Sequence, residues 1–233
     1  MILMIQKNIS MYINKEFSDE LEPISDLSKS TAGKVLVKDD RCLYNFDSIT
    51  KKIYKFKKVP SSVDALFVTN KVLLLTEFKS GFKRRISKES IDYKKLTCPK
   101  NNKIICKDYG EMLIRKADLE TQELLDSVKF KAVESYITLE KQIFPRCMNL
   151  PIANKLRVVF CVVIDDYIDD MENTLAELAG TSTIPNSFES IKNALSRFVQ
   201  IKTADNEDFY YDEIKVFSPY EYKHYLNSLQ KRG

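Results

Sequence analysis

Two acidic residues and a lysine stand among apolar runs in the stretch PSSVDALFVTNKVLLLTEFKSG, which spans Pro60–Gly81. Asp64 lies in the first apolar run, Glu77 closes the second, and Lys79 follows Glu77 by two positions. Charged side chains are seldom fully buried unless they pair with or bind something. Carboxylates are the donors that a hard cation such as Mg²⁺ takes, and a lysine beside them can stabilise developing negative charge. This set of residues therefore suggests metal-assisted attack on a phosphate ester.

Two strands are predicted around these residues, over Val63–Val68 and Val72–Lys79, because both segments are rich in Val, Leu and Phe. The break between them indicates an antiparallel hairpin with a two-residue loop at Asn70 and Lys71, since Asn tolerates the positive φ that such a turn needs. In that hairpin the numbers of facing residues sum to 141, as 70 and 71 do. Another loop length would shift the register.

The predicted register places Asp64 directly opposite Glu77, with Cβ atoms about 5 Å apart. Lys79 points to the same face, because alternate residues of a strand share a face. The two carboxylates repel each other, and a divalent cation between them would offset that repulsion. Lys79 would then hold the attacking water or stabilise charge on the phosphate. Alternatively, Asp64 faces water at a strand end, and Glu77 and Lys79 form a solvent-facing pair.

The stretch resembles the core motif of the PD-(D/E)XK nuclease superfamily, the restriction-endonuclease-like fold. Asp64 matches the first acid, Glu77 the second and Lys79 the lysine, while Pro60 precedes the first acid by four residues instead of one. The flanking S-V-D-A-L-F and T-E-F-K-S-G look like an uncharacterised bacterial subgroup, and the specific likeness covers roughly Val59–Gly81. The resemblance implies a Mg²⁺- or Mn²⁺-dependent nuclease that hydrolyses phosphodiester bonds, with DNA favoured over RNA.

The resemblance also implies residues outside the hairpin. Many members add an acid from the first helix as a further metal ligand, which makes Glu20 the favoured candidate, with Glu16 and Glu22 as alternatives. Many members place a basic or amide side chain on the helix after the lysine strand, and Lys131 and Lys116 are the candidates here. Solvated surface positions are the alternative reading of both lysines.

The charge of the chain is unevenly distributed, although its net value is only +4. Twelve Lys or Arg stand against four Asp or Glu over Lys79–Lys116, whereas twelve acidic residues stand against three basic ones over Asp165–Glu213. Lysine and arginine contacts to phosphates supply sequence-independent affinity for nucleic acid. The candidates for such contacts, beside Lys131, are Lys83, Arg84, Arg85 and Lys88. A plain solvated surface is the alternative.

The elements that must position these residues predict an α/β (mixed α+β) fold, in which helices flank a mixed central sheet. Further strands are expected at Lys34–Lys38, Leu156–Ile164 and Glu213–Phe217. Helices are expected at Ser18–Ser30, Glu111–Ile143, Asp165–Ala179, Ser187–Val199 and Tyr220–Leu229. Pro145 is expected to end the long helix. Asp39–Tyr54 is ambiguous, with one possible helical face capped by Asp39 or Asp40.

The length of 233 residues indicates a single nuclease-like domain, with a core over roughly 16–165 and an extension of the same domain, including extra helices, over 166–233. No apolar run reaches transmembrane length and the N-terminus does not read as a signal peptide, so no membrane partner and a cytoplasmic location are expected. Five cysteines without a C-x-x-C pair predict free thiols, not disulfides or a zinc site. His224 is expected on a helix surface.

Three kinds of function remain open from the sequence. The first is the metal-dependent nuclease, for which a homodimer is a compatible form, since twofold symmetry pairs two sites. The second is a catalytically silent nuclease-fold module that binds nucleic acid or a protein. The third is a structural or regulatory protein whose acidic C-terminal part docks a basic partner. All three motif residues are present, which favours the enzyme.

Overall fold

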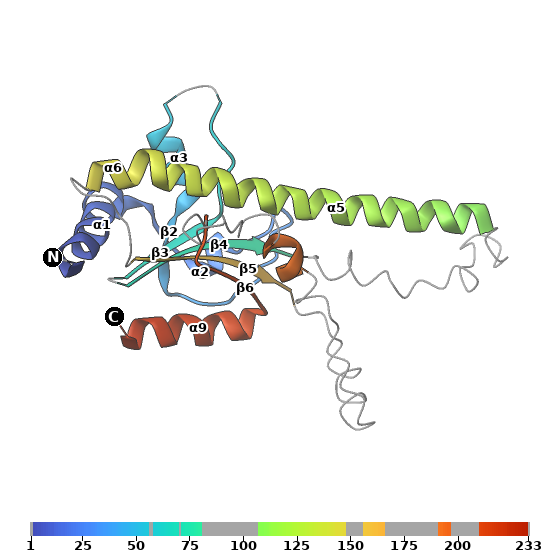
Figure 1. Cartoon of the computed structure of the whole chain (residues 1–233). Helices are drawn as coiled ribbons and strands as arrows, with labels where there is room; N and C mark the ends of the chain where they lie inside the picture. The colour runs from blue at the N-terminus through green and yellow to red at the C-terminus, as the bar shows by residue number, and fades with distance from the viewer. Residues whose placement is uncertain are drawn as a thin grey trace.

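A six-stranded sheet forms the centre of the fold, with its strands in chain order (Figure 1). The structure is a computed structural model, and it describes residues 2–55, 58–69, 71–80, 107–147, 156–165, 191–196 and 210–232. Neighbours are antiparallel from β1 to β4, whereas β4–β5 and β5–β6 are parallel. The strands are β1 (Leu21–Pro23), β2 (Cys42–Asn45), β3 (Ala65–Val68), β4 (Val72–Lys79), β5 (Arg157–Ile164) and β6 (Glu213–Phe217).

Helices cover both faces of the sheet, which makes three layers (Figure 1). One face packs against α1 (Ile2–Phe17), α3 (Phe46–Ile53), α5 (Lys107–Thr138) and α6 (Phe144–Cys147). The other face packs against α2 (Ile24–Leu27) and α9 (Pro219–Arg232). The remaining helical turns are η1 (Ser18–Glu20), η4 (Leu139–Ile143) and residues 191–196. The described residues thus form the expected mixed α/β architecture, with a mixed open sheet.

The alternation of side chains along β4 decides which face each residue of the motif occupies. Leu73 and Leu75 are buried in the cluster under α5, whereas Leu74 and Phe78 are buried in the cluster under α9. Because successive side chains of a strand point to opposite faces, Glu77 lies on the α5 side with Leu73 and Leu75. Lys79 has the same parity, so both charged residues of β4 face the long helix.

The helix predicted over Ser18–Ser30 is wrong. The chain there forms η1, then β1, then the single turn of α2. Pro23 sits in β1, which is the outermost strand of the sheet, and a proline is tolerated there because an edge strand leaves one side unpaired. The N-terminal helix is α1 instead, and its residues Ile9, Ile13 and Phe17 are buried at helical spacing.

Two further segments differ from or refine their predictions. In place of the strand predicted over Lys34–Lys38, the structure has one isolated bridge, between Lys29 and Val35. The ambiguous segment Asp39–Tyr54 splits into β2 and α3. The cap of α3 is Asn45, whose side chain accepts a hydrogen bond from the Ser48 N–H, and not Asp39 or Asp40. The spacing of apolar residues is compatible with a single helix over this segment, but its first part pairs with β1 and β3 and is therefore a strand.

The later elements follow the predictions closely. Strands β5 and β6 match the expected segments, and α9 includes the predicted helix Tyr220–Leu229. The long helix is present, but it continues through the π-type turn η4 into α6, so Pro145 does not end it. The π-type turn η4 ends two residues before Pro145 and alters the regular i→i−4 hydrogen bonding, so the proline is accommodated without ending the helix.

The segment expected as an extension belongs to the same layers as the rest. Strand β6 pairs along β5, and α9 buries Tyr222, Leu226 and Leu229 against the sheet. Asp165–Ala179 lies outside the described residues beyond Asp165, and of Ser187–Val199 only residues 191–196 are described, as helix.

The hairpin is attached to α5 by a buried hydrogen bond, in which the Val63 N–H donates to the Ser135 hydroxyl over 3.0 Å. Ser135→Ala leaves that buried N–H without its partner, so we expect the free energy of unfolding to fall by about 2 kcal/mol in urea denaturation. The control is Ser127→Ala, at an exposed position of the same helix. Equal stability of the two variants would contradict this account of how the hairpin is held.

Candidate functional site

The hairpin register brings Asp64 and Glu77 side by side. Ala65 pairs with Thr76 and the numbers of all paired residues sum to 141, which confirms the predicted register. Asp64 stands one residue before β3, where its Oδ2 accepts a hydrogen bond from the Phe78 N–H over 2.7 Å. This bond orients the carboxyl of Asp64 along β4, next to Glu77.

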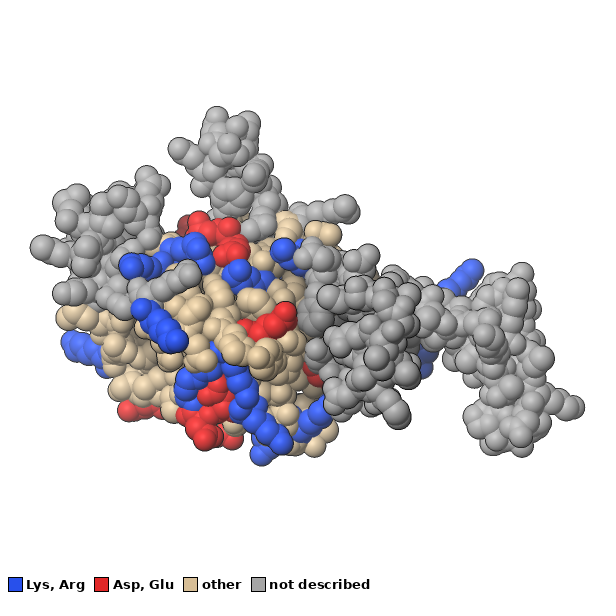
Figure 2. All heavy atoms as spheres, turned by 90° about the horizontal axis from the view of Figure 1, so that it is seen from below, with Lys and Arg blue, Asp and Glu red and all other residues tan. Residues whose placement is uncertain are grey.

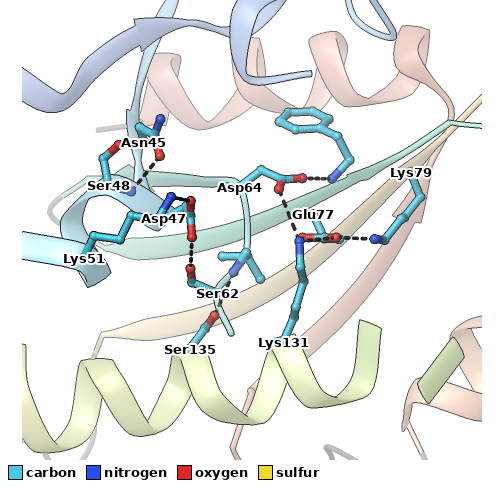
Figure 3. A network of polar contacts seen from close by, with 12 residues as sticks. Asn45, Asp47, Ser48, Lys51, Ser62, Asp64, Glu77, Lys79, Lys131 and Ser135 are labelled. Atoms are coloured by element: carbon cyan, nitrogen blue, oxygen red, sulfur yellow. Dashed lines mark hydrogen bonds and ion pairs between the residues drawn. The ribbon is translucent and has the colours of Figure 1, made fainter. Parts of the chain in front are cut away.

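Two lysines converge on the buried carboxylate of Glu77 (Figure 3). The Nζ of Lys79 lies 2.9 Å from Oε1 of Glu77, and its side chain comes from the same strand. The Nζ of Lys131 donates to both oxygens of Glu77, over 2.8 and 2.9 Å, and lies 3.4 Å from Oδ1 of Asp64. Helix α5 therefore supplies a charge that bridges the two acids, and the predicted convergence of the motif gains a fourth member.

Burial sets the electrostatics of this cluster. Glu77 is fully buried. Burial, followed by the neighbouring charge of Glu77, raises the pKa of Asp64 to about 7, although Lys131 acts in the opposite direction. Burial alone would lower the pKa of Lys131, but the charges of Glu77 and Asp64 outweigh it and raise that pKa. Lys131 is therefore held as an ammonium, and its charge compensates the acid pair.

The position of Lys131 extends the prediction made for it. The sequence indicated a lysine that contacts nucleic acid, whereas the structure places its Nζ inside the acid pair. The signal was the buried face of α5, where Val128, Ala132 and Ser135 are buried at helical spacing on either side of it. A lysine on such a face needs a partner of opposite charge.

Asp47 is an acid near the site that sequence reasoning did not single out. It lies in the first turn of α3, accepts a hydrogen bond from the Ser62 hydroxyl over 2.8 Å and pairs with Lys51 (Figure 3). Partial burial acts to raise the pKa of Asp47, but the hydrogen bonds from Lys51 and Ser62 and the charges of Lys51 and Lys131 outweigh burial and lower that pKa. Its spacing from the hairpin gave no signal, because strand pairing brings α3 there.

The other predicted residues lie elsewhere. Glu20 pairs with Lys52 of α3, and no group of three or more His, Cys, Asp or Glu side chains within the described ranges is placed to hold a metal ion. The role of Glu20 as a third ligand therefore stays a prediction. Lys116 is exposed on α5. The four basic candidates Lys83, Arg84, Arg85 and Lys88 lie outside the described residues.

The donor set of the site fits a divalent cation. Both oxygens of Glu77 and Oδ1 of Asp64 are directed at one point, which the ammonium of Lys131 occupies. Mg²⁺ is commonly held by one or two carboxylates together with waters and substrate phosphate oxygens. Asp64 and Glu77 are therefore a donor pair of the kind that holds Mg²⁺ when water and substrate supply the remaining ligands.

Comparison with protein-family models, with curated proteins and with solved structures finds no match to this chain. Of the helices in the described ranges, none combines the length and the apolar character needed to cross a membrane.

The raised pKa of Asp64 predicts a pH-dependent stability in the absence of metal. The folded state favours the protonated form of Asp64, so this carboxyl contributes fully to the free energy of unfolding below about pH 4. That contribution falls as the pH rises above about 4 and is lost once the pH has passed about 7. Asp64→Asn cannot ionise and avoids this loss. We expect the difference in free energy of unfolding between Asp64→Asn and the wild type to change in favour of the variant, by up to about 4 kcal/mol, from pH 4 to pH 8 in EDTA.

The control for this experiment is Asp47→Asn, because the pKa of Asp47 is lowered and its ionisation costs the fold nothing over that range. A constant difference between Asp64→Asn and the wild type from pH 4 to pH 8 would contradict the assigned environment of Asp64.

Proposed function

We propose that the protein is a metal-dependent nuclease that hydrolyses phosphodiester bonds, with DNA the favoured substrate. The observation that carries the proposal is the fully buried carboxylate of Glu77, which faces Asp64 across a hairpin while two ammonium groups converge on it. Such a cluster costs stability and has no evident role in packing. Titratable groups with perturbed pKa values cluster at functional sites, which further supports a catalytic role.

Each residue has a distinct role in this proposal. Asp64 and Glu77 hold a Mg²⁺ or Mn²⁺ ion, which when bound supplies Lewis acidity and a water of lowered pKa. Lys79 extends from the end of β4 with its side chain 20% exposed, so its ammonium can reach an incoming phosphate. There it orients the attacking water or donates to the oxygens on which charge develops. The Phe78 N–H keeps Asp64 in place throughout.

The arrangement of elements supports the resemblance noted in the sequence. An N-terminal helix, an antiparallel hairpin carrying the acids, a long crossover helix and a parallel strand follow one another, as that fold requires. A restriction-endonuclease-like core is accordingly part of the proposal.

The position of the acid pair favours the α5 side of the sheet as the side that meets nucleic acid. On the face that carries α9, acidic and basic side chains of the described residues are intermixed (Figure 2). The acid pair and its lysines lie on the opposite side of the sheet, under α5. The basic stretch Lys83–Lys88 begins four residues after the last residue of β4 in sequence, and lysine and arginine contacts to phosphates supply sequence-independent affinity for nucleic acid.

Removal of either acid tests the proposal. We expect Asp64→Asn and Glu77→Gln to lower nicking of supercoiled plasmid in Mg²⁺ or Mn²⁺ at least 1,000-fold, because each removes a metal ligand. Glu140→Gln, at an exposed position of the same layer, should cleave as the wild type does. Urea denaturation of each variant checks that the fold persists. Cleavage that survives in both folded variants would exclude this site.

Substitution of Lys79 separates chemistry from metal binding. Lys79→Met keeps both acids but removes the charge next to the phosphate, so cleavage should fall by about 100- to 1,000-fold. Calorimetric titration should still show Mn²⁺ binding to this variant. Loss of metal binding together with activity would instead place Lys79 among the groups that hold the acid pair in shape.

A further inference from the structure

The ammonium of Lys131 occupies the place that a metal ion requires. Its Nζ lies 2.8 and 2.9 Å from the two oxygens of Glu77 and 3.4 Å from Oδ1 of Asp64. The other oxygen of Asp64 is taken by the Phe78 N–H. A Mg²⁺ ion binds oxygen at about 2.0–2.1 Å. Because both cations would use the same three oxygens, the ammonium and the ion exclude each other.

The charges of the cluster balance without a metal. With Asp64 ionised, the two carboxylates of Asp64 and Glu77 face two ammonium groups, those of Lys79 and Lys131. An added divalent ion would leave an excess of two positive charges in a largely buried site, which is unfavourable. The excess falls if Lys131 withdraws to solvent or pairs with a substrate phosphate.

The side chain of Lys131 is able to withdraw. It is 24% exposed, whereas the neighbouring residues Val128, Ala132 and Ser135 anchor α5 in the core. Only the flexible side chain has to move, and the helix backbone stays in place. Asp47, whose pKa is lowered in part by the charge of Lys131, offers a third negative charge nearby. Lys79 differs, because it contacts one oxygen of Glu77 and comes from the same strand.

We propose that Lys131 is an internal cation that substitutes for the divalent metal and sets the metal affinity of the site. This inference rests on the proposed function. In the absence of substrate it holds the acid pair together and keeps metal binding weak. A phosphodiester arriving at the site provides the alternative partner for the ammonium, so metal and substrate enter together. By reciprocity, each strengthens the binding of the other.

The test is calorimetric titration of Mn²⁺ into the full chain without nucleic acid. Lys131→Met and Lys131→Gln remove the charge, and we expect both to bind Mn²⁺ at least tenfold more tightly than the wild type. Lys131→Arg keeps the charge and should bind as weakly as the wild type. The matched control is Lys129→Met on the same helix, whose ammonium pairs with Asp126 at 3.0 Å and should leave the affinity unchanged.

A second readout covers loss of stability in the neutral variants. Melting temperatures are compared in EDTA and in Mn²⁺, because ligand bound only to the folded state raises the melting temperature. The rise should be larger for Lys131→Gln than for the wild type, and it should vanish in Lys131→Gln combined with Glu77→Gln.

The possible outcomes separate this inference from the proposed function. Equal or weaker Mn²⁺ binding by both neutral variants, with wild-type binding that Glu77→Gln removes, overturns the role of Lys131 and leaves the metal site standing. An absence of Mn²⁺ binding in the wild type and in every Lys131 variant overturns both. A tenfold gain that Lys129→Met reproduces would also overturn the inference, since it would reflect overall charge.

Discussion

The need to compensate one buried carboxylate, that of Glu77, organises the rest of the structure. An uncompensated charge at a fully buried position of β4 would cost several kcal/mol, and an ion pair repays that cost only when its geometry is good. Lys131 supplies that geometry from 54 residues away in sequence, with contacts to both oxygens. The placement of α5 against the sheet is therefore a condition for burying Glu77 at all.

Several hydrogen bonds fix the position of α5 along its axis, so that Lys131 lies next to Glu77. The Val63 N–H donates to Ser135 one turn after Lys131, and the Ser61 N–H donates to Glu134. Within the core cluster between α5 and the sheet, the buried Tyr211 hydroxyl donates to the Ala132 carbonyl over 2.6 Å. The same helix is thus bonded to the segment that enters β3 and to Tyr211, two residues before β6. A shift of α5 by one residue would break these bonds together with the pairing to Glu77.

The sequence was sufficient for the hairpin and insufficient for its surroundings, for a physical reason. The pairing of Asp64 with Glu77 follows from period-two alternation and a two-residue turn, both of which are local. The strand β1, by contrast, exists because Leu21 and Pro23 pair with β2, and no local spacing reports that pairing. The contact of Lys131 with Glu77 and the position of Asp47 near the site also depend on how the helices pack on the sheet. The sequence therefore indicated Lys131 as a candidate but did not indicate which residues it contacts.

The cluster of Asp64, Glu77, Lys79 and Lys131 affects stability as well as the proposed function. An acid with a pKa raised to about 7 lowers the stability of the fold at neutral pH relative to an amide at the same position, and this chain carries Asp64 in spite of that cost. Residues that lower stability are expected where activity requires them, because a site built for a cation or a phosphate carries uncompensated charge without it. Lys131 reduces that strain by filling the position in the absence of metal. If the site binds a divalent ion as proposed, the same contact opposes that ion, so stability of the metal-free protein and tight metal binding compete, and a bound substrate shifts the balance.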